Sequence, residues 1–307
     1  MRSSTILLSA LAAPLAVHAQ DSTLSSSKRG LVYVQTNDAS SDDSIWDSST
    51  SDLTWYYNYK AEPTSTYTNH LQFVPMLWGA PSDNTSMDFY NTVKGLVDGG
   101  MNISYILTFN EPDGCTSGGS CVDAQTAAET WIREIEPLKK LGIKLGAPAV
   151  TGAPNGFNWL QNFFTQCAGQ CSADFIPVHW YGNFEGLASH MGQVNGTYPN
   201  MTMWVTEFAD SDVSLADSQA FYNQSTEYMD RLDYVTHYSY FGAFRSDVSN
   251  VGPNAAMLTQ KGQLTDIGAW YLGQKATGNI PKGDAAQMTR FAGSIILVVA
   301  AGFYLIL

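Results

Sequence analysis

The sequence is poor in positive charge. Among its 307 residues, 15 are Lys or Arg and 28 are Asp or Glu, so the formal net charge is −13 at pH 7. Such a surface repels nucleic acid and anionic lipid, and we therefore expect neither a nucleic-acid partner nor direct adsorption to a membrane. The acidic composition is more compatible with an uncharged polymer as the partner.

Cysteine is scarce too: the chain has four, in two close pairs, Cys115 with Cys121 and Cys167 with Cys171. Four cysteines allow three disulfide connectivities, and in an oxidising compartment we expect the local one, within each pair. A zinc site would need tighter cysteine spacing and histidines close by, and the Gly/Ser loop from Cys115 to Cys121 provides neither. The sequence therefore predicts no metal and no cofactor.

The amino-terminal residues have the pattern of a secretory signal peptide. An apolar run, Ile6–Val17, follows Arg2, and Val17-His-Ala19 is a small-residue cleavage site. We expect residues 1–19 to be removed and the protein to be secreted, which would place its cysteines in an oxidising compartment.

A dibasic pair, Lys28-Arg29, comes next. One interpretation is a processing site, which makes residues 20–29 a short propeptide-like segment and Gly30 the first residue of the mature chain. The other interpretation is a solvated pair in a linker. Both are compatible with the sequence.

The carboxyl-terminal residues have the order of a glycosylphosphatidylinositol (GPI) signal. Phe291–Leu307 is an apolar run of 17 residues, and residues 278–290 form a linker that contains the small residues Gly283-Asp-Ala-Ala286. We expect cleavage after Gly283 or Asp284 and a GPI anchor as the protein's only link to the plasma membrane, at the cell surface or cell wall. A tail-anchored helix is the alternative, which the signal peptide disfavours.

Secretion would also make Asn-X-Ser/Thr sequons into candidate glycan acceptors. The chain has five of them, at Asn84, Asn102, Asn195, Asn200 and Asn223.

From Gly30 to residue 277 no Pro/Ser linker interrupts the rhythm of apolar runs and helical patterns, so we expect one domain there. Eight short apolar runs lie in it, at Leu31–Val34, Thr54–Tyr57, Phe73–Trp78, Tyr105–Phe109, Lys144–Pro148, Phe175–Trp180, Met203–Phe208 and Tyr234–Phe241. They are continuous rather than alternating, which is typical of strands covered on both faces. Helical patterns lie between most of them, most clearly at Asp123–Leu141, where Asp123 is a candidate N-cap and Gly142 the stop, and also at Asp88–Val97 and Ser218–Leu232.

Eight strands that alternate with helices over about 250 residues predict an α/β fold with a single (β/α)₈ TIM barrel. A doubly wound open sheet is the alternative. It is less favoured because no glycine fingerprint follows the first apolar run.

Two glutamates stand at the ends of apolar runs. Asn110-Glu111-Pro112 follows the fourth run, and Glu207 closes the seventh. In a barrel, catalytic groups lie at the carboxyl ends of the strands, so we expect both at one face. Most glutamates are solvated surface residues, but the end of an apolar run is an awkward place for that role. Two carboxylates at one site are what a retaining glycosidase needs.

Aromatic and amide side chains stand at further strand ends. The candidates for substrate binding are Asn58, Trp78, Asn110, His179, Tyr181 and Tyr240. Sugar rings stack their C–H faces on aromatic rings and their hydroxyls need polar partners, so the set predicts a sugar-binding cleft. The alternatives are a satisfied buried histidine at His179 and core aromatics at Trp78 and Tyr240.

Three motifs carry a family resemblance: Phe109-Asn-Glu-Pro-Asp113, the block from Cys167 to Gly182 that contains Val178-His-Trp-Tyr181, and Trp204-Val-Thr-Glu-Phe-Ala209. In this order and spacing the chain resembles the fungal glycoside hydrolase family 128 β-1,3-glucanases over about Gly30–Gly273. The resemblance implies a clan A (β/α)₈ barrel, retaining chemistry on β-1,3-glucan and an association with the fungal cell wall.

The resemblance also implies residue roles. The family's acid/base falls on Glu111 and its nucleophile on Glu207, while Asn110, His179 and Tyr181 match positions that line the site. The chain departs from the family in the loop from Cys115 to Cys121 and at Tyr240, where a tryptophan is usual. We expect both departures to face the cleft and to affect the shape of the subsites and the preferred chain length of the substrate.

We therefore expect a monomeric retaining β-1,3-glucan hydrolase, endo-acting, with transglycosylation where an acceptor sugar replaces water. Double displacement would require Glu111 to be protonated, through burial and the charge of Glu207, and would place the carboxyl groups about 5–5.5 Å apart. The alternative is a wall-glucan-binding protein that keeps the cleft without turnover. A structural wall protein is disfavoured because Ser/Thr-rich repeats are absent from the sequence.

Overall fold

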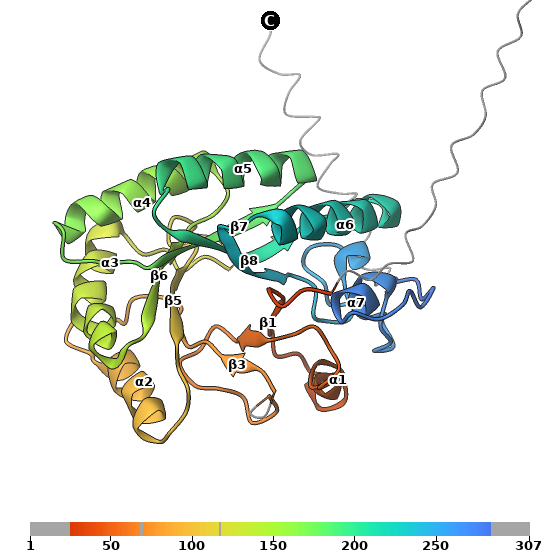
Figure 1. The fold of residues 1–307 in the computed structure, drawn as a ribbon, viewed down its shortest axis with the longest axis horizontal. Helices are drawn as coiled ribbons and strands as arrows, with labels where there is room; N and C mark the ends of the chain where they lie inside the picture. Colours follow the sequence, from red (N-terminus) through yellow and green to blue (C-terminus); the bar gives the residue numbers. More distant parts are fainter. Residues whose placement is uncertain (1–24, 68–69, 117, 284–307) are drawn as a thin grey trace, which may run out of the picture.

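The structure is a computed structural model that describes residues 25–67, 70–116 and 118–283. The expected signal peptide and the apolar carboxyl-terminal run lie outside these residues. Among the described residues, no helix is long and apolar enough to cross a membrane. The described chain forms a ring of parallel strands with helices outside it (Figure 1), as predicted.

The strands follow one another around the ring in chain order. They are β1 (Gly30–Val32), β2 (Trp55–Tyr57), β3 (Gln72–Phe73), β4 (Met76–Leu77), β5 (Tyr105–Asn110), β6 (Lys144–Ala149), β7 (Phe175–Tyr181), β8 (Thr202–Ala209) and β9 (Val235–Tyr240). Arg29, directly before β1, pairs in parallel with Tyr238 of β9. The first and last strands are therefore neighbours, and the (β/α)₈ barrel fold is confirmed.

The third predicted strand, Phe73–Trp78, is divided in two. Pro75 separates β3 from β4 because it has no backbone N–H to place in a ladder. The backbone nevertheless runs on in register: the Val74 amide donates to the Tyr56 carbonyl at 2.9 Å, and the Leu107 amide donates to the Pro75 carbonyl at 2.9 Å. β3 and β4 thus share one position of the barrel, which leaves eight positions for nine strands.

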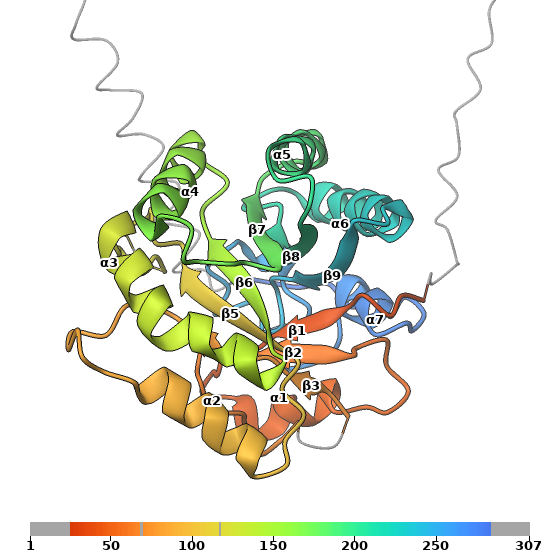
Figure 2. The same cartoon turned by 60° about the vertical axis from the view of Figure 1, so that its left-hand side comes forward.

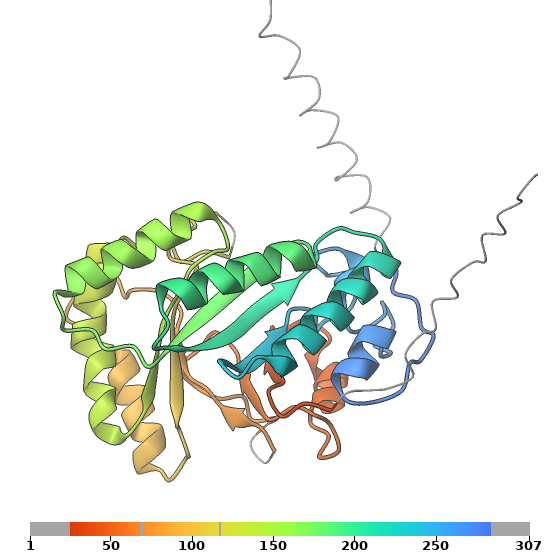
Figure 3. The same ribbon diagram turned by 45° about the horizontal axis from the view of Figure 1, so that its top comes forward.

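The helices surround the barrel (Figures 2 and 3). They are α1 (Ala39–Trp46), α2 (Asp88–Asp98), α3 (Ala124–Thr130), α4 (Pro154–Cys167), α5 (Phe184–Thr197), α6 (Leu215–Arg231) and α7 (Asp266–Tyr271). The prediction for Ser218–Leu232 starts too late, because Ser214 caps α6 by accepting a hydrogen bond from the Asp217 amide.

The helix predicted at Asp123–Leu141 is interrupted. Asp123 caps α3 as expected, and Gly142 ends the segment with a φ of 81°. Between them, α3 continues into a π-helical turn, Trp131–Ile135, and a 3₁₀ turn, Glu136–Leu141. Pro137 explains the break, because it has no N–H to donate four residues back.

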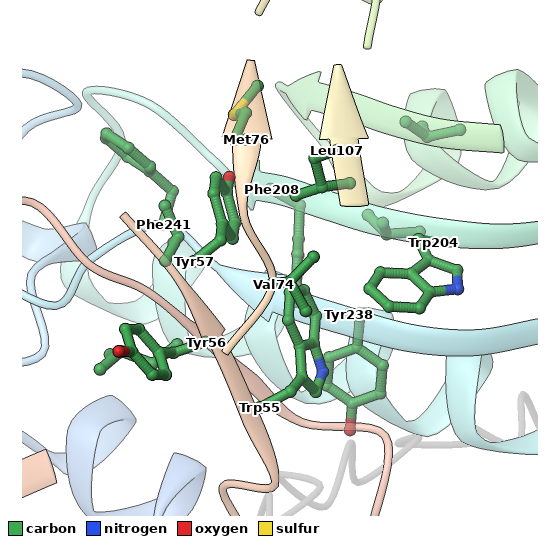
Figure 4. Close-up of a cluster of buried hydrophobic side chains, with 14 of the residues drawn as sticks. Trp55, Tyr56, Tyr57, Val74, Met76, Leu107, Trp204, Phe208, Tyr238 and Phe241 are labelled. Atoms are coloured by element: carbon green, nitrogen blue, oxygen red, sulfur yellow. The ribbon is translucent and has the colours of Figure 1, made fainter. Parts of the chain in front are cut away.

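Aromatic rings fill the amino-terminal end of the barrel. Trp204 stacks on His237 with ring centroids 3.7 Å apart, and Trp55 and Tyr105 each lie 4.9 Å from Trp204. These four residues come from β8, β9, β2 and β5, so they meet in the barrel interior; Figure 4 shows Trp55 and Trp204 together there. This packed layer closes one end and leaves the other for a site.

Both disulfides are local, as predicted: Cys115 is bonded to Cys121 and Cys167 to Cys171. The first follows β5 at the carboxyl end of the barrel. The second joins the end of α4 to the loop before β7, at the opposite end.

The dibasic pair is part of the fold rather than a solvated linker. Arg29 is 2% exposed, pairs with Asp52 at 2.8 Å and donates to the Trp270 carbonyl. The Lys28 ammonium donates to the carbonyls of Met229, Asp230 and Leu232 at the end of α6. The interpretation as a solvated pair is therefore wrong for Arg29.

Candidate active site

A cavity of about 470 Å³ opens at the carboxyl ends of the strands. It is lined by Val34, Tyr59, Trp78, Asn110, Glu111, Gly118, Tyr181, Glu207, Ser211, Phe241, Asn250 and Val251. Both predicted catalytic glutamates face it, which is the arrangement expected for a barrel enzyme.

Glu111 is placed by an unusual backbone. It follows β5 with a φ of 41°, and Phe109, two residues earlier, has a φ of 33°. Residues other than glycine rarely adopt this left-handed backbone conformation, so hydrogen bonds must hold the Glu111 backbone in place. The Glu111 amide donates to the Ala149 carbonyl of β6 at 2.7 Å, and the Glu111 carbonyl accepts from the Gly114 amide at 2.9 Å.

Glu207 reaches the cavity through an irregularity in β8. Val205 pairs with Val178 of β7 and Glu207 pairs with His179, so Thr206 is an extra residue between them. Trp204 points into the barrel, and strict alternation would turn a side chain three residues later to the outer face. The extra residue shifts the alternation by one, which brings Glu207 back inside.

His179 lies between the two carboxylates. Its Nδ1 is 3.1 Å from Oε1 of Glu111 and 3.5 Å from Oε2 of Glu207, and the side chain is 1% exposed. One oxygen from each glutamate and one nitrogen of His179 all lie within 4.8 Å of one another. These three could also hold a metal ion, but the glutamate oxygens already accept hydrogen bonds from protein groups.

Phenols surround Glu207, which is 4% exposed. Tyr59 donates to its Oε1 at 2.7 Å and Tyr181 to its Oε2 at 2.5 Å. Tyr57 donates to the Thr206 carbonyl at 3.0 Å and lies 3.4 Å from Oε1. Burial and the charge of Glu207 raise the pKa of Tyr59 and of Tyr181 well above 10, so both phenols stay protonated donors.

The proton of the Glu111–His179 pair lies on the histidine. Burial alone would lower the pKa of His179, but the charges of Glu207 and Glu111 outweigh it and raise the pKa above 6.5. Burial alone would raise the pKa of Glu111, but the hydrogen bond from His179 outweighs it and lowers the pKa below 4.5. The expectation that burial and Glu207 keep Glu111 protonated is thus wrong for the free site.

Four of the six predicted binding residues lie at the site. Trp78 and Tyr181 present aromatic surface to the cavity and are 41% and 37% exposed. Asn110 lines the cavity, and its Nδ2 donates to the Gly118 carbonyl at 2.7 Å. Its Oδ1 is buried and has no hydrogen-bond partner among the described residues. His179 joins them through its contact with Glu111.

Asn58 does not line the cavity. Its Nδ2 donates to the Glu62 carbonyl at 2.9 Å and its Oδ1 accepts from the Lys60 amide at 3.2 Å. The residue therefore holds a turn, and its neighbour Tyr59 faces the cavity. The prediction of Asn58 as a binding residue is therefore wrong, because the sequence shows where the strand ends but not the direction of each side chain.

Tyr240 does not line the cavity either. It is 1% exposed and packs among the rings of Phe208, Tyr222 and Tyr271, outside the barrel wall. The next residue along the chain, Phe241, lines the cavity instead. The departure from the family at Tyr240 therefore does not shape the cavity.

The sequence prediction did not include Tyr57 and Tyr59, the two tyrosines from β2 and the turn after it that reach Glu207. Tyr57 and Tyr59 are two residues apart in Trp55-Tyr-Tyr-Asn-Tyr59, the spacing of side chains on one strand face. That spacing was a usable signal.

Comparison with known proteins agrees with the geometry. Residues 30–271 match the family model of the glycosyl hydrolase catalytic core. The chain belongs to this family. It is therefore a glycoside hydrolase, and the matched residues begin at the predicted domain start.

The resemblance to glycoside hydrolase family 128 is confirmed, because solved structures of that family are similar to this chain. A subgroup VI exo-β-1,3-glucanase from Aureobasidium namibiae has a TM-score of 0.69 at 21% identity, with 80% of this chain and 95% of that one covered. A mutant form of a subgroup I endo-β-1,3-glucanase from Amycolatopsis mediterranei, in complex with laminarihexaose, has a TM-score of 0.64 at 26% identity, with 81% and 100% covered.

A relative by sequence is alkali-sensitive linkage protein 1 of Schizosaccharomyces pombe, 29% identical over 256 residues. The match covers 80% of this chain but 44% of that protein, so the chain spans less than half the length of this relative.

Proposed function

We propose that this glycoside hydrolase is a retaining β-1,3-glucanase that acts on fungal cell-wall glucan, with Glu207 as nucleophile and Glu111 as acid/base. The separation of the carboxylates carries the proposal. One oxygen of Glu111 and one oxygen of Glu207 lie within 4.8 Å of each other. This approach is compatible with the roughly 5–5.5 Å between the carboxyl groups of retaining enzymes and leaves less room than the roughly 6.5–9.5 Å that inverting enzymes need for a water.

The proposed reaction has two displacements. In the first, a Glu207 oxygen bonds to the anomeric carbon, the glycosidic bond breaks, and the departing oxygen takes a proton from Glu111. Glu111 shares that proton with His179, whose Nδ1 lies 3.1 Å from Oε1 of Glu111. In the second, water attacks the anomeric carbon, Glu111 takes the water's proton, and the ester bond to Glu207 breaks. An acceptor sugar in place of water would give transglycosylation.

Substrate and location are supported by different observations. Aromatic surface from Trp78, Tyr181 and Phe241 faces the cavity, and family members of known structure are β-1,3-glucanases. We propose endo action by a monomer, although the relatives include both exo and endo enzymes. Secretion and a GPI anchor at the cell wall follow from the terminal sequence patterns.

The test compares Glu111→Gln and Glu207→Gln with Glu185→Gln, a change at an exposed glutamate on the outside of the barrel. Sugar release from laminarin should fall about 10²–10⁴-fold in Glu111→Gln, the usual contribution of general acid–base catalysis, and further in Glu207→Gln. Glu185→Gln should keep full activity. NMR of the first product should show the β-anomer.

Two results would overturn the proposal: full activity in Glu111→Gln, or an α-anomer as first product. Laminarin binding without sugar release by the unaltered protein would establish the glucan-binding alternative instead. Product lengths from defined β-1,3-gluco-oligosaccharides separate endo from exo action, and products longer than the substrate reveal transglycosylation. Light scattering measures the oligomeric state.

A further inference from the structure

Tyr59 holds a backbone conformation that its residue type disfavours. Its φ is 60°, in the left-handed region that glycine and asparagine enter far more readily than an aromatic residue. An unfavourable conformation at a cavity is a reason to ask what the side chain does there.

The Tyr59 side chain reaches the proposed nucleophile. Its Oη donates to Oε1 of Glu207 at 2.7 Å. The ring packs edge-on against Tyr57, with centroids 5.0 Å apart, and Tyr57 is in turn hydrogen-bonded to the Thr206 carbonyl. Through Tyr57, Tyr59 therefore packs against the same irregular stretch of β8 that contains Glu207.

The two oxygens of Glu207 have different surroundings. Oε1 faces Tyr59 and Tyr57, on the side of β2. Oε2 accepts from Tyr181 and lies 3.5 Å from His179, the residue that also contacts Glu111. Oε2 is therefore on the side of the acid/base, where the scissile bond must lie for Glu111 to protonate it.

We propose that Tyr59 is a positioning residue that fixes the rotation of the Glu207 carboxylate and makes Oε2 the attacking oxygen. This inference rests on the proposed function. Oε2 forms the bond to the anomeric carbon, and Oε1 becomes the carbonyl oxygen of the glycosyl ester, still hydrogen-bonded to Tyr59. When water displaces the ester, negative charge returns to Glu207 and the phenol of Tyr59 stabilises it.

The role in the second displacement gives a kinetic signature. A phenol bonds more strongly to a carboxylate than to an ester carbonyl, because hydrogen bonds to charged groups are the stronger ones. Loss of the Tyr59 hydroxyl should therefore slow breakdown of the glycosyl ester more than its formation. The ester then accumulates, so kcat and KM fall together while kcat/KM, which reports the first displacement, changes less.

The test is Tyr59→Phe, which keeps the ring and its packing on Tyr57. With laminarihexaose we expect kcat to fall about tenfold or more, the effect of losing one hydrogen bond to a charged group. KM should fall in parallel, and the mass spectrum of acid-quenched protein should show a glycosyl adduct that the unaltered enzyme does not accumulate.

Tyr33→Phe is the matched control. It removes a phenol–carboxylate hydrogen bond of similar length, 2.9 Å to Asp43, from a residue that does not line the cavity. It should leave kcat, KM and the adduct unchanged.

An unchanged kcat in Tyr59→Phe, or a fall in kcat with constant KM and no adduct, would overturn the inference. Glu207→Gln distinguishes this from failure of the proposed function. An inactive Glu207→Gln with a normal Tyr59→Phe removes only the role of Tyr59, whereas an active Glu207→Gln removes both.

Discussion

At the scale of single residues, Glu111 and His179 share the proton that the leaving group needs. Burial would raise the pKa of Glu111, but the hydrogen bond from His179 outweighs it and lowers the pKa, so the carboxyl is ionised at neutral pH. His179 holds the proton 3.1 Å away, with a pKa raised by the two glutamates. The pair titrates as a unit, so the acid that catalysis requires is the protonated pair.

This sharing predicts the pH dependence of the enzyme. Because the pKa of His179 lies above 6.5, the pair keeps its proton above that pH, and the alkaline limb of kcat/KM should lie above pH 6.5. In His179→Asn the proton depends on Glu111 alone, and burial then raises the pKa of that carboxyl above its ordinary value. A carboxyl starts well below an imidazole, so the limb should still move to lower pH. A pH series of kcat/KM on laminarin measures both.

The control is His190→Asn, at a histidine on α5 that stacks on Trp180 away from the carboxylates. This variant should leave the alkaline limb of kcat/KM where it is.

Stability gives a second readout. The raised folded pKa of His179 adds stability that is complete below pH 6.5 and disappears as pH rises through the folded pKa. The fall in Tm with rising pH should therefore be smaller in His179→Asn. If the alkaline limb of kcat/KM did not move in His179→Asn, the shared proton would be excluded.

At the scale of elements, the sequence predicts which strand ends carry the site but not which side chains face it. Continuous apolar runs located all eight barrel positions, and counting them placed Glu111 and Glu207 correctly. The predictions at Asn58 and Tyr240 are wrong by one residue, because the next residue along the chain, Tyr59 or Phe241, lines the cavity instead. A continuous apolar run shows where a strand ends but not which of two successive side chains faces inward.

The same limit applies to Glu207, for a different reason. It faces the cavity only because Thr206 is an extra residue in β8, and such irregularities depend on pairing with the neighbouring strand. The break at Pro75 and the one near Pro137, by contrast, have a cause that is visible in the sequence.

The disulfide loop after β5 is an element whose removal should change substrate affinity. The Gly118 carbonyl accepts from Asn110 Nδ2, and the Ser120 amide donates to the Asn110 carbonyl. Opening the loop with Cys115→Ser and Cys121→Ser would free the asparagine amide, so we expect KM for β-1,3-gluco-oligosaccharides to rise several-fold.

The second disulfide is the control. Cys167→Ser with Cys171→Ser opens a loop of similar length at the far end of the barrel. Its loss should reduce the free energy of unfolding by about 2 kcal/mol through loop-closure entropy and leave KM unchanged. Equal KM values in the two double variants would show that the loop after β5 does not position Asn110.

At the scale of the whole molecule, the residues before β1 complete the barrel. Arg29 pairs with Tyr238 of β9 and reaches Asp52 and α7, while Lys28 caps the end of α6. Three parts of the chain that are far apart in sequence are thus joined at the closure of the barrel. Processing after Arg29 would remove all of these contacts at once.

Replacing Arg29 should therefore destabilise the protein strongly. Arg29→Ala removes the charged partner of Asp52, whose side chain is 14% exposed and is left, among the described residues, with hydrogen bonds from Ser25 and Ser26, which costs about 3–5 kcal/mol of unfolding free energy. Lys94→Ala, which breaks a solvent-exposed pair with Asp98 on α2, should leave the free energy of unfolding nearly unchanged. Denaturant unfolding measures both.

The same argument predicts where the mature form of the proposed secreted protein begins. We expect it to begin at Gln20 rather than at Gly30, so its intact mass should include residues 20–29. A stable, active chain that starts at Gly30 would show that the barrel closes without them.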